Sequence, residues 1–508
     1  MGKDFSFSSY KFKFKFTEKR LSRIWNWVLK EKGLLLLAFA LVFIKKWEPG
    51  GHIDATWYSS LARNIAESGD FFHFSINPFF ASEVYDHFPL DYWIMGGLMS
   101  LFGVSDFVAR SYFLVCSFLS YLFFFGVANQ ILGRRYAYIS LIVFALCLGA
   151  TKWSGAIKHD VPLTLAFLAS TYFFIRSLRN PKYLLALAPL FVFGVFVKGP
   201  VIFGFPLALI LWSGLGGGIS WMRNKEFVFS LGLLFALLWI PNIEALQFDG
   251  ESFYWIFLQS KWNYLNVGAS QESSYLFYWK DLVIKQPHIF LLFLSSILVL
   301  ILKRKRFSWD QKKKILLCGI MVLSILGPLS MFSFKLSYYS LPALPFYALI
   351  SSVGPYYLLR NKDWNWSLGI FRLALATILI FVALPIKTTG ARHKRVTNMV
   401  NQVKLLNGVK ARPLYFLGYY DEDMSIFQEF KFYGGLDLRS ARRRQLSRLD
   451  PDKVQLVVRI QDLPVQVGPK EVDESDCWIR NSQYCVYMPK DQILIELPEE
   501  KWPQEVYD

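Results

Sequence analysis

The chain has few charged residues, and it lacks several motifs that would mark common classes of soluble enzyme. Only 19% of its 508 residues are charged, whereas 54% are hydrophobic and 18% are aromatic. That composition is too apolar for an ordinary soluble enzyme and favours a membrane protein with several spans. We find no Gly-rich phosphate loop positioned for a nucleotide and no convincing zinc spacing. No small-residue cleavage site precedes the late first apolar run, so we expect no cleaved signal peptide.

Acidic residues are scarce relative to basic ones. The 38 Asp and Glu residues against 56 Lys and Arg residues give a formal net charge of +18. The basic residues fall between apolar runs, so membrane topology explains them better than nucleic-acid binding, and we expect no nucleic-acid partner. The main basic clusters occupy alternate loops: Arg134–Arg135, Arg176–Lys182, Arg223–Lys225, Lys303–Lys314 and Arg360–Lys362. This alternation predicts a cytoplasmic N-terminus and an external C-terminus, although Lys45, Lys46 and Lys152 go against the rule.

The apolar runs divide the chain into three parts. We expect a basic cytoplasmic tail over residues 1–32, an α-helical membrane domain over residues 33–389 and a soluble domain over residues 390–508. A span needs about 20 apolar residues. The runs predict about eleven spans, near residues 33–44, 110–132, 136–151, 160–175, 183–197, 200–214, 227–243, 282–302, 314–332, 338–359 and 367–386. The loops 45–109 and 244–281 then face the external side.

The last part of the chain changes in composition and reads as a small external α/β domain. Strand-like runs occur at Arg412–Leu417, Val454–Ile460 and Gln492–Leu497, with turn and helix-like residues between them. Cys477 and Cys485 are close enough in sequence to bridge a hairpin, which an oxidising compartment would permit. Two free thiols are the alternative. The other cysteines lie in apolar runs and are expected to be inert packing residues: Cys116, Cys147 and Cys318.

The segment Lys45–Trp93 gathers ionisable groups among aromatic residues, directly after the first apolar run. We expect Asp54 to lie near the bilayer surface, because it follows that run closely. Ionisable groups are costly to hold at a membrane boundary and are usually functional there. The candidates in this segment are Asp54, Tyr58, Arg63, Glu83, Asp86 and His87.

Six short motifs follow one another along the chain: Asp54 with Tyr58 and residues 61–70 (LARNIAESGD), Asp86–Trp93 (DHFPLDYW), Leu101–Ser105 with Arg110, Asp160–Leu163 (DVPL), Lys198–Pro200 (KGP) and Lys335–Pro342 (KLSYYSLP). In this order they resemble the GT-C membrane glycosyltransferases, in particular the group that contains protein O-mannosyltransferases and the aminoarabinose transferase that modifies lipid A. The resemblance covers roughly residues 33–390. Two departures are Ala55, where the group has an acidic residue, and His87, where it has a lysine.

The resemblance implies a GT-C fold and a hexosyl or pentosyl transferase. Such an enzyme moves a sugar from a polyprenyl-phosphate donor to a hydroxyl or phosphate of lipid A, another glycolipid or a protein, with inversion. It implies membrane lipids as partners and a bacterial inner membrane, with the reaction on the external face. The missing nucleotide loop agrees with a lipid-linked donor. No cofactor is implied, although a divalent cation at the carboxylates stays open.

The chemistry of such a transfer asks for particular side chains. A lipid phosphate is already a good leaving group, so no glycosidase-like general acid is needed. The reaction needs a base for the acceptor hydroxyl and cations for the departing phosphate. Asp54 is the candidate base, and Asp86 and Asp160 could share that work, orient the sugar or hold a cation. Expected substrate contacts come from Tyr58, Arg63, Glu83, His87, Lys198, Lys261, Lys335, Tyr338 and Tyr339.

Each candidate also has a simpler structural explanation. Asp160 precedes an apolar helix that carries Pro162, which is a good arrangement for a helix cap. Lys198 and Lys335 could place their ammonium groups at span ends while their stems stay apolar. His87 could be an ordinary loop residue, since a free histidine is mostly uncharged near neutral pH.

Two other classes of protein fit part of the sequence. A transporter or lipid flippase would also have many spans, but it would place ionisable residues near the bilayer midplane and often shows two repeated halves. Here the acidic residues gather at one face, and we find no repeat. A non-enzymatic assembly protein built around the soluble tail would not need those carboxylates. The aromatic loop 244–281 suits a mobile cover over a lipid-linked donor and equally an ordinary interfacial loop.

Overall fold

The computed structural model describes residues 53–76, 84–85, 87–239, 258, 274–332, 335–359, 396, 399–404, 413–417, 424–480 and 483–488. The basic tail, the first and last expected spans and the strand-like run Gln492–Leu497 lie outside these residues. Among the candidate site residues, Glu83, Asp86 and Lys261 also lie outside them.

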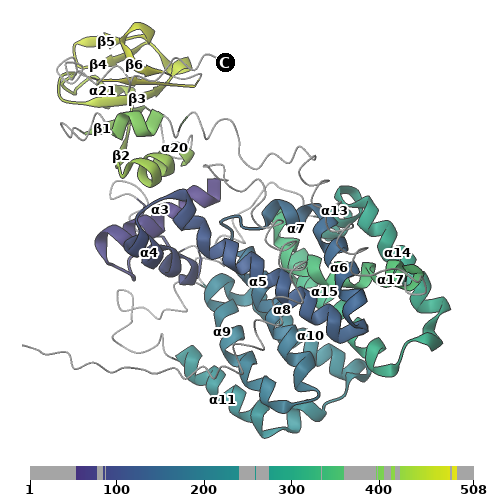
Figure 1. Ribbon diagram of the computed structural model, residues 1–508. Coiled ribbons are helices and arrows are strands. Elements are labelled where there is room, and N and C mark those ends of the chain that lie inside the picture. The colour runs from purple at the N-terminus through teal and green to yellow at the C-terminus, as the bar shows by residue number, and fades with distance from the viewer. Residues whose placement is uncertain are drawn as a thin grey trace, which may run out of the picture.

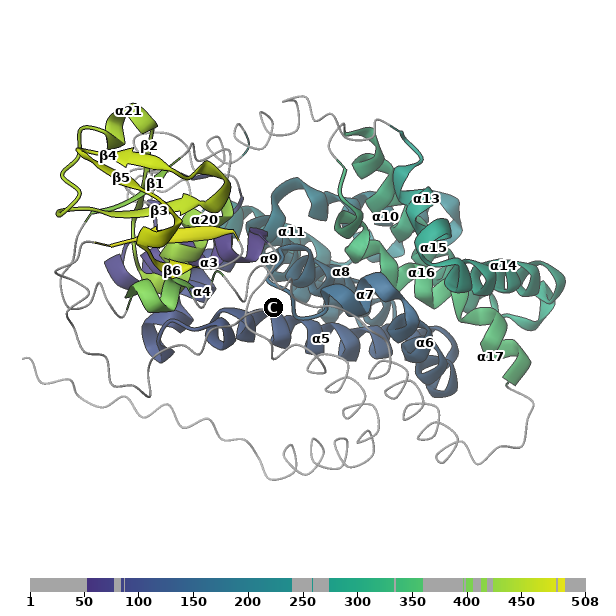
Figure 2. The same ribbon diagram turned by 90° about the horizontal axis from the view of Figure 1, so that it is seen from above.

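Helices form the body of the molecule. They are α3 (Ile53–Ser68), α4 (Leu90–Phe102), α5 (Asp106–Leu132), α6 (Arg134–Leu146), α7 (Leu148–Trp153), α8 (Asp160–Ser177), α9 (Leu187–Lys198), α10 (Gly204–Trp212), α11 (Lys225–Trp239), α13 (Phe277–Lys285), α14 (Pro287–Leu302), α15 (Trp309–Met331), α16 (Leu344–Ser351) and α17 (Val353–Leu359). Short 3-10 segments join some of them, among them η1 (Pro181–Ala186), η2 (Gly199–Phe203) and η8 (Ser337–Ala343). A smaller sheet-containing domain lies beside α3 and α4, at one end of this body (Figures 1 and 2).

Local sequence signals set the ends of the long helices. α5 begins after Ser105, whose side chain accepts a hydrogen bond from the Val108 amide at 3.3 Å. The helix ends at Gly133, whose φ of 89° lets the chain turn away at little steric cost. α15 begins with a capping box between Ser308 and Gln311. These caps satisfy amide groups that the first turn of a helix leaves without a partner.

Helix α8 is central in the helical body (Figure 1). It packs against α5, α9 and η8, and nearly all of its side chains are buried. Neighbouring helices therefore surround its N-terminal end, where Asp160 is the first helical residue. The side chain of His159, which precedes Asp160, makes no capping hydrogen bond.

Three helical stretches of the described part are long and apolar enough to cross a membrane: Asp106–Leu132, Pro181–Gly217 and Trp309–Met331. Helices α13 and α14 meet at 101° and would together make a fourth. The stretch Pro181–Gly217 covers two runs that the sequence predicts as separate spans. At Gly199, the first residue of η2 directly after α9, φ is +64°, which marks a break in the helical backbone. The number of eleven spans stays a prediction.

The C-terminal domain is built on a five-stranded sheet with the order β2-β1-β3-β7-β6. Its strands are β1 (Leu414–Leu417), β2 (Leu438–Ala441), β3 (Gln455–Arg459), β6 (Cys477–Arg480) and β7 (Tyr484–Tyr487). The β1–β2 and β1–β3 pairs are parallel, whereas β3–β7 and β6–β7 are antiparallel. A second, two-stranded sheet joins β4 (Val465–Val467) to β5 (Lys470–Val472). The runs Arg412–Leu417 and Val454–Ile460 thus contain β1 and β3.

Helical turns and one disulfide complete the domain. The helical segments that matter below are α20 (Met424–Glu429), the π-helical turn η10 (Phe430–Gly434) and α21 (Arg443–Leu446). Cys477 and Cys485 form a disulfide that joins β6 to β7. A multi-helical body with a small α/β domain at its C-terminal end confirms the fold class expected from the sequence.

Candidate active site

The first part of the site joins the start of α3 to the loop before α8. Lys158 forms an ion pair with Asp54, and the Tyr338 hydroxyl donates a hydrogen bond to the same carboxylate oxygen at 3.0 Å. The ammonium group of Lys158 also lies 3.8 Å from the centroid of the Tyr338 ring. The Asp54 side chain stays 25% exposed, whereas that of Lys158 is buried. Asp54 is therefore held by at least two donors while its side chain stays partly exposed.

Burial and charge shift the titration of the groups around Asp54 in defined directions. Burial lowers the pKa of Lys158, because it disfavours the charged ammonium, and the nearby Asp54 carboxylate acts in the opposite sense. The Tyr338 hydroxyl donates to the Asp54 carboxylate and can therefore orient it.

The second part of the site pairs the first residue of α8 with the last residue of α9. Lys198 lies 2.5 Å from Asp160, and both side chains are buried. The Lys198 ammonium is also 4.2 Å from the centroid of the Tyr339 ring. Gly199 follows with a positive φ, and a Cβ there would press into the ring of Phe88. Only glycine suits that position, which gives the Lys-Gly-Pro motif a physical reason.

The third part of the site is a buried histidine–carboxylate pair. His159 Nδ1 lies 2.6 Å from Asp91 Oδ2, and the Tyr112 hydroxyl donates to Asp91 Oδ1 at 2.9 Å. Burial raises the pKa of Asp91, and the hydrogen bonds from His159 and Tyr112 act against this rise. The His159 ring stacks on that of His87, with centroids 4.5 Å apart, and lies 4.3 Å from that of Tyr58.

Three consecutive residues thus organise the site. Lys158, His159 and Asp160 each pair with a residue from a different helix, namely α3, α4 and α9. The two lysine–carboxylate pairs are mostly withdrawn from water. Away from water, opposite charges attract one another more strongly, so each pair holds its two side chains in place. The N-terminal end of α8 therefore connects α3, α4 and α9 close to Asp54.

A large apolar cavity opens beside the second pair. Its volume is about 980 Å³, and residues of α9, α10, α11 and α15 form its walls. Lys198 and Tyr339 line it together with two serines, and the remaining lining is apolar or aromatic. A cation beside a long apolar cavity suits an amphiphile with an anionic head, because each end of that molecule finds a matching surface.

The structure brings together many of the candidates but not all of them. Asp54, Asp160, Lys198, Tyr338 and Tyr339 belong to the connected site described above. Tyr58 and His87 pack around His159 instead of lying beside a lysine. The side chain of Lys335 is buried, with its ammonium 5.9 Å from the centroid of the Tyr275 ring. Arg63 reaches away from these groups and donates to the backbone oxygen of Phe432 at 2.6 Å.

Sequence reasoning missed three members of the site. Lys158 and His159 stand directly before Asp160, so a run of three ionisable residues at the start of an apolar helix was a signal that could have found them. Asp91 lies inside the motif Asp86–Trp93, in a place with no assigned role. Among the described residues, no group of three His, Cys, Asp or Glu side chains could hold a metal ion. The described carboxylates of the site pair with lysine or histidine instead.

Comparison with known proteins agrees with this fold. Residues 86–243 match the sequence model of the dolichyl-phosphate-mannose-protein mannosyltransferase family, and this stretch includes Asp91, Lys158 to Asp160 and Lys198. A search of curated proteins finds no match. The expected resemblance to the GT-C membrane glycosyltransferases is confirmed, and the chain has their fold.

Two solved proteins illustrate the similarity. ArnT from Cupriavidus metallidurans, in a crystal structure bound to undecaprenyl phosphate, is 14% identical with a TM-score of 0.66. The match covers 91% of this chain and 97% of that one. The archaeal oligosaccharyltransferase AglB from Archaeoglobus fulgidus, in complex with an inhibitory peptide and a dolichol-phosphate, is 13% identical with a TM-score of 0.52. That match covers 86% of this chain and 70% of the AglB chain.

Proposed function

We propose that the protein transfers a sugar from a polyprenyl-phosphate donor to an acceptor on a glycolipid or a protein. The single observation that carries this proposal is the Asp160–Lys198 pair at the wall of a large apolar cavity, beside the partly open Asp54 carboxylate. A polyprenyl chain would occupy the cavity, and its phosphate would lie near Lys198. The resemblance in fold to a protein that was crystallised with undecaprenyl phosphate supports this choice of donor.

The reaction follows from the positions of the charged groups. An acceptor hydroxyl attacks the anomeric carbon of the sugar, and the bond between that carbon and the phosphate oxygen breaks. The hydroxyl proton passes to Asp54, and the lipid phosphate leaves with the bonding electrons. Lys198 and Lys158 supply positive charge where negative charge develops on the leaving phosphate. Attack opposite to the leaving group inverts the anomeric centre.

Asp160 and Tyr338 have supporting roles in this scheme. Asp160 fixes the Lys198 ammonium at the cavity wall, because the two groups form a buried pair at 2.5 Å. Tyr338 donates to Asp54 and so helps to fix the orientation of that carboxylate. We further propose Lys335 as a second cation for the donor phosphate. Glu83, Asp86 and Lys261 stay candidates for sugar or phosphate contacts.

A flippase for a lipid-linked sugar is the alternative, since it would also need an apolar cavity and a phosphate-binding cation. The experiment that separates the two uses purified protein in liposomes with an undecaprenyl-phosphate sugar and a mixture of glycolipid and protein acceptors. A transferase releases undecaprenyl phosphate and glycosylates an acceptor, whereas a flippase moves the intact donor across the bilayer. Intact donor after long incubation, with every acceptor class present, would refute the transferase. Mass spectrometry of envelope glycolipids and glycoproteins, with and without the protein, would then identify the acceptor.

We place the reaction on the external face of a bacterial inner membrane, with the N-terminus in the cytoplasm. The alternating basic loops support this orientation. The disulfide between Cys477 and Cys485 supports it independently, because disulfides persist in oxidising compartments. Reporter fusions at Lys225 and at Asp508 should report opposite sides of the membrane. Reporters on the same side would contradict the orientation.

A further inference from the structure

The C-terminal domain contacts the same helix that carries Asp54. Four polar residues of α3, Thr56, Ser60, Arg63 and Glu67, are spaced three or four apart and so share one face of the helix. Thr56 Oγ1 donates to the side-chain oxygen of Gln428 at 3.1 Å, and Ser60 Oγ donates to the Gln428 backbone oxygen at 3.0 Å. Both contacts are buried. This face of α3 is therefore an interface between the two domains.

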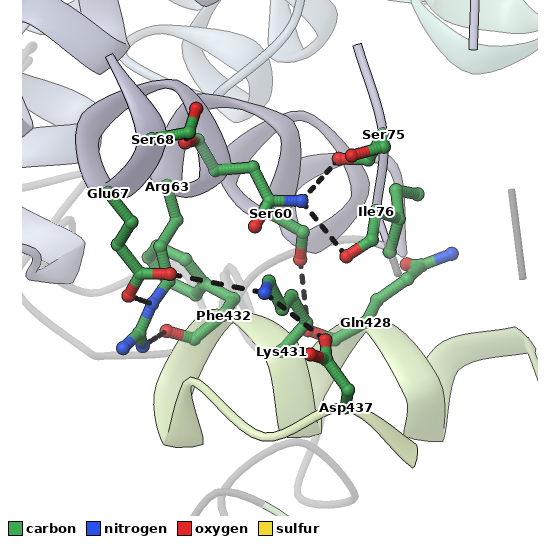
Figure 3. Close-up of polar contacts among 11 residues, drawn as sticks. Ser60, Arg63, Glu67, Ser68, Ser75, Ile76, Gln428, Lys431, Phe432 and Asp437 are labelled. Atoms are coloured by element: carbon green, nitrogen blue, oxygen red, sulfur yellow. Dashed lines mark hydrogen bonds and ion pairs between the residues drawn. The ribbon is translucent and has the colours of Figure 1, made fainter. Parts of the chain in front are cut away.

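Arg63 extends the interface by another turn of α3. Its Nη1 donates to the backbone oxygen of Phe432 at 2.6 Å, and its Nε donates to Glu67 at 2.6 Å. Lys431 lies 3.2 Å from Asp437 and 3.9 Å from Glu67. Figure 3 shows how Arg63 and Glu67 of α3 contact Phe432 and Lys431 of the turn η10. One of the two Arg63 bonds crosses to the C-terminal domain, and the other holds the guanidinium in place against Glu67 of the same helix. A planar guanidinium held in this way directs its bond to Phe432 better than a single flexible ammonium would.

Apolar side chains cross the interface in both directions. Trp57 of α3 packs against the core of the C-terminal domain. In return, Phe432 belongs to the core of the helical body, and Tyr433 packs against that core as well. The Tyr433 hydroxyl also lies 3.3 Å from Asp106 at the start of α5. Interdigitated cores resist sliding, so the two domains are locked together here and do not merely touch.

We propose that the C-terminal domain acts as a clamp that fixes the position of α3, with Arg63 as its main positioning residue. Asp54 lies in the first turn of that helix, so the clamp holds its carboxylate opposite Lys158 and Tyr338. Gly435 adjoins the clamp, and a Cβ there would press on the tip of the Arg63 guanidinium, which would have to shift away. Its φ of +68° is the conformation that favours glycine.

Hydrogen–deuterium exchange tests the clamp directly in the full-length protein in detergent. Arg63→Met removes the guanidinium from one domain, and Gly435→Ala pushes against it from the other. Both should raise the exchange rate of the α3 amides in residues 53–60 by about tenfold, because local opening becomes easier when packing contacts are lost. Arg63→Lys should raise the exchange rate less, because lysine keeps the positive charge but lacks the planar guanidinium with its several donors.

A matched control separates the clamp from simple backbone strain. Gly69, just past the end of α3, has a φ of +73° and open space around the position of a Cβ. Gly69→Ala therefore adds similar backbone strain next to the same helix without touching the C-terminal domain, and residues 53–60 should exchange as in the wild type. Unchanged exchange of residues 53–60 in both Arg63→Met and Gly435→Ala would overturn the clamp. Amides of β3 report whether the domain itself stays folded.

The consequence for catalysis rests on the function proposed above. If α3 shifts, the rate of sugar transfer from an undecaprenyl-phosphate sugar should fall by about tenfold to a hundredfold, because small displacements of a reacting group are costly. Binding of undecaprenyl phosphate should stay within about twofold, since the cavity and Lys198 do not contact the clamp. Because Gly435→Ala acts through Arg63, combining both changes should lower the rate no further than the stronger single change. A wild-type protein without transfer activity would refute the transferase, while the exchange experiment would still decide the clamp.

Discussion

Ion pairs of the same chemistry have different surroundings in the two parts of the molecule. In the helical body, Asp160 and Lys198 lie 2.5 Å apart with side chains that are 3% and 7% exposed. In the C-terminal domain, Asp450 and Lys453 lie 3.2 Å apart, but their side chains are 45% and 80% exposed. An exposed pair gains little from association, because water and salt already screen both charges. Burial, more than distance, therefore decides what each pair contributes.

Buried pairs carry a desolvation penalty that their attraction does not always repay. Replacing such a pair by well-packed apolar side chains is often neutral or stabilising, so stability alone does not explain why it is retained. The helical body nevertheless keeps two lysine–carboxylate pairs and one histidine–carboxylate contact on consecutive residues, at Lys158, His159 and Asp160. Their concentration around a partly open carboxylate indicates that they serve positioning and charge stabilisation. The C-terminal domain has an apolar core, and its ion pairs range from partly buried, as at Lys431 and Asp437, to exposed, as at Asp450 and Lys453. It shows no comparable run of pairs among the described residues.

The largest effect should come from the open carboxylate. Asp54→Asn keeps the shape and the hydrogen bond from Tyr338 but removes the base, so transfer to a hydroxyl acceptor should slow by about 10²–10⁴-fold. The measurement is transfer from an undecaprenyl-phosphate sugar in liposomes, with donor binding followed in parallel. Donor binding should change little.

If Asp54→Asn keeps more than about a tenth of the wild-type rate, the loss is smaller than general-base catalysis predicts. The base would then have to be sought at Asp86 or Asp160. The same variant also separates acceptor classes. A phosphate acceptor is already ionised at neutral pH and needs no base, so a small effect on a phosphate acceptor beside a large effect on a hydroxyl acceptor would show that Asp54 acts on the acceptor proton.

The next effect should come from breaking a buried pair. Lys198→Met leaves the Asp160 carboxylate buried without its cation, which typically costs about 3–5 kcal/mol of stability. Thermal unfolding of the detergent-solubilised protein measures this loss. Binding of undecaprenyl phosphate should also weaken, because the cavity loses its cation.

The double variant Lys198→Met with Asp160→Asn provides the control for this pair. It removes both charges, so it should recover much of the stability that Lys198→Met loses, while undecaprenyl phosphate binding stays weak. Recovery of binding together with stability would show that Lys198 does not contact the phosphate. Lys335→Ala should weaken donor binding more than Asp54→Asn does, if Lys335 is the second phosphate cation.

Sequence alone predicted the fold class, and five of the candidate residues that it singled out lie together in the structure, because both depend on local patterns. Apolar runs mark helices, and short strand-like runs marked β1 and β3. Asp54 and Asp160 stand in short motifs at the ends of apolar runs, where a polar residue is conspicuous. The Lys-Gly-Pro motif likewise contains Lys198, and the structure shows that Gly199 is needed for its backbone conformation.

The rest could not be predicted because it depends on contacts between distant segments. Nothing near Asp91 in the sequence indicates that His159 will be its partner, since only the packing of α4 against the loop before α8 brings them together. Arg63 was expected to bind substrate, but it donates to a backbone carbonyl 369 residues away. A backbone acceptor has no side-chain identity, so no sequence pattern could reveal it.

The disulfide should have a moderate effect that is confined to the C-terminal domain. Cys477 and Cys485 are separated by 8 residues, and cross-linking a loop of that length stabilises a domain by about 2–3 kcal/mol on the chain-entropy model. The double variant Cys477→Ser with Cys485→Ser should unfold that domain earlier and leave the helical body nearly unchanged. Hydrogen–deuterium exchange of β7 and α8 distinguishes the two domains. Thiol labelling of both cysteines in the denatured, unreduced wild type would contradict the bridge.

The smallest effect should come from the exposed counterpart of the Lys198 pair. Lys453→Met makes the same chemical change as Lys198→Met, but at a side chain that is 80% exposed, in the turn before β3. Its partner Asp450 stays hydrated when the ammonium is lost, so no buried charge is left behind. Exposed pairs of this kind contribute about 0–1 kcal/mol, and added salt weakens even that. The melting temperature of Lys453→Met should therefore stay close to that of the wild type. Any small difference between the two melting temperatures should disappear at high salt. A loss as large as that of Lys198→Met would show that burial does not separate the two regions.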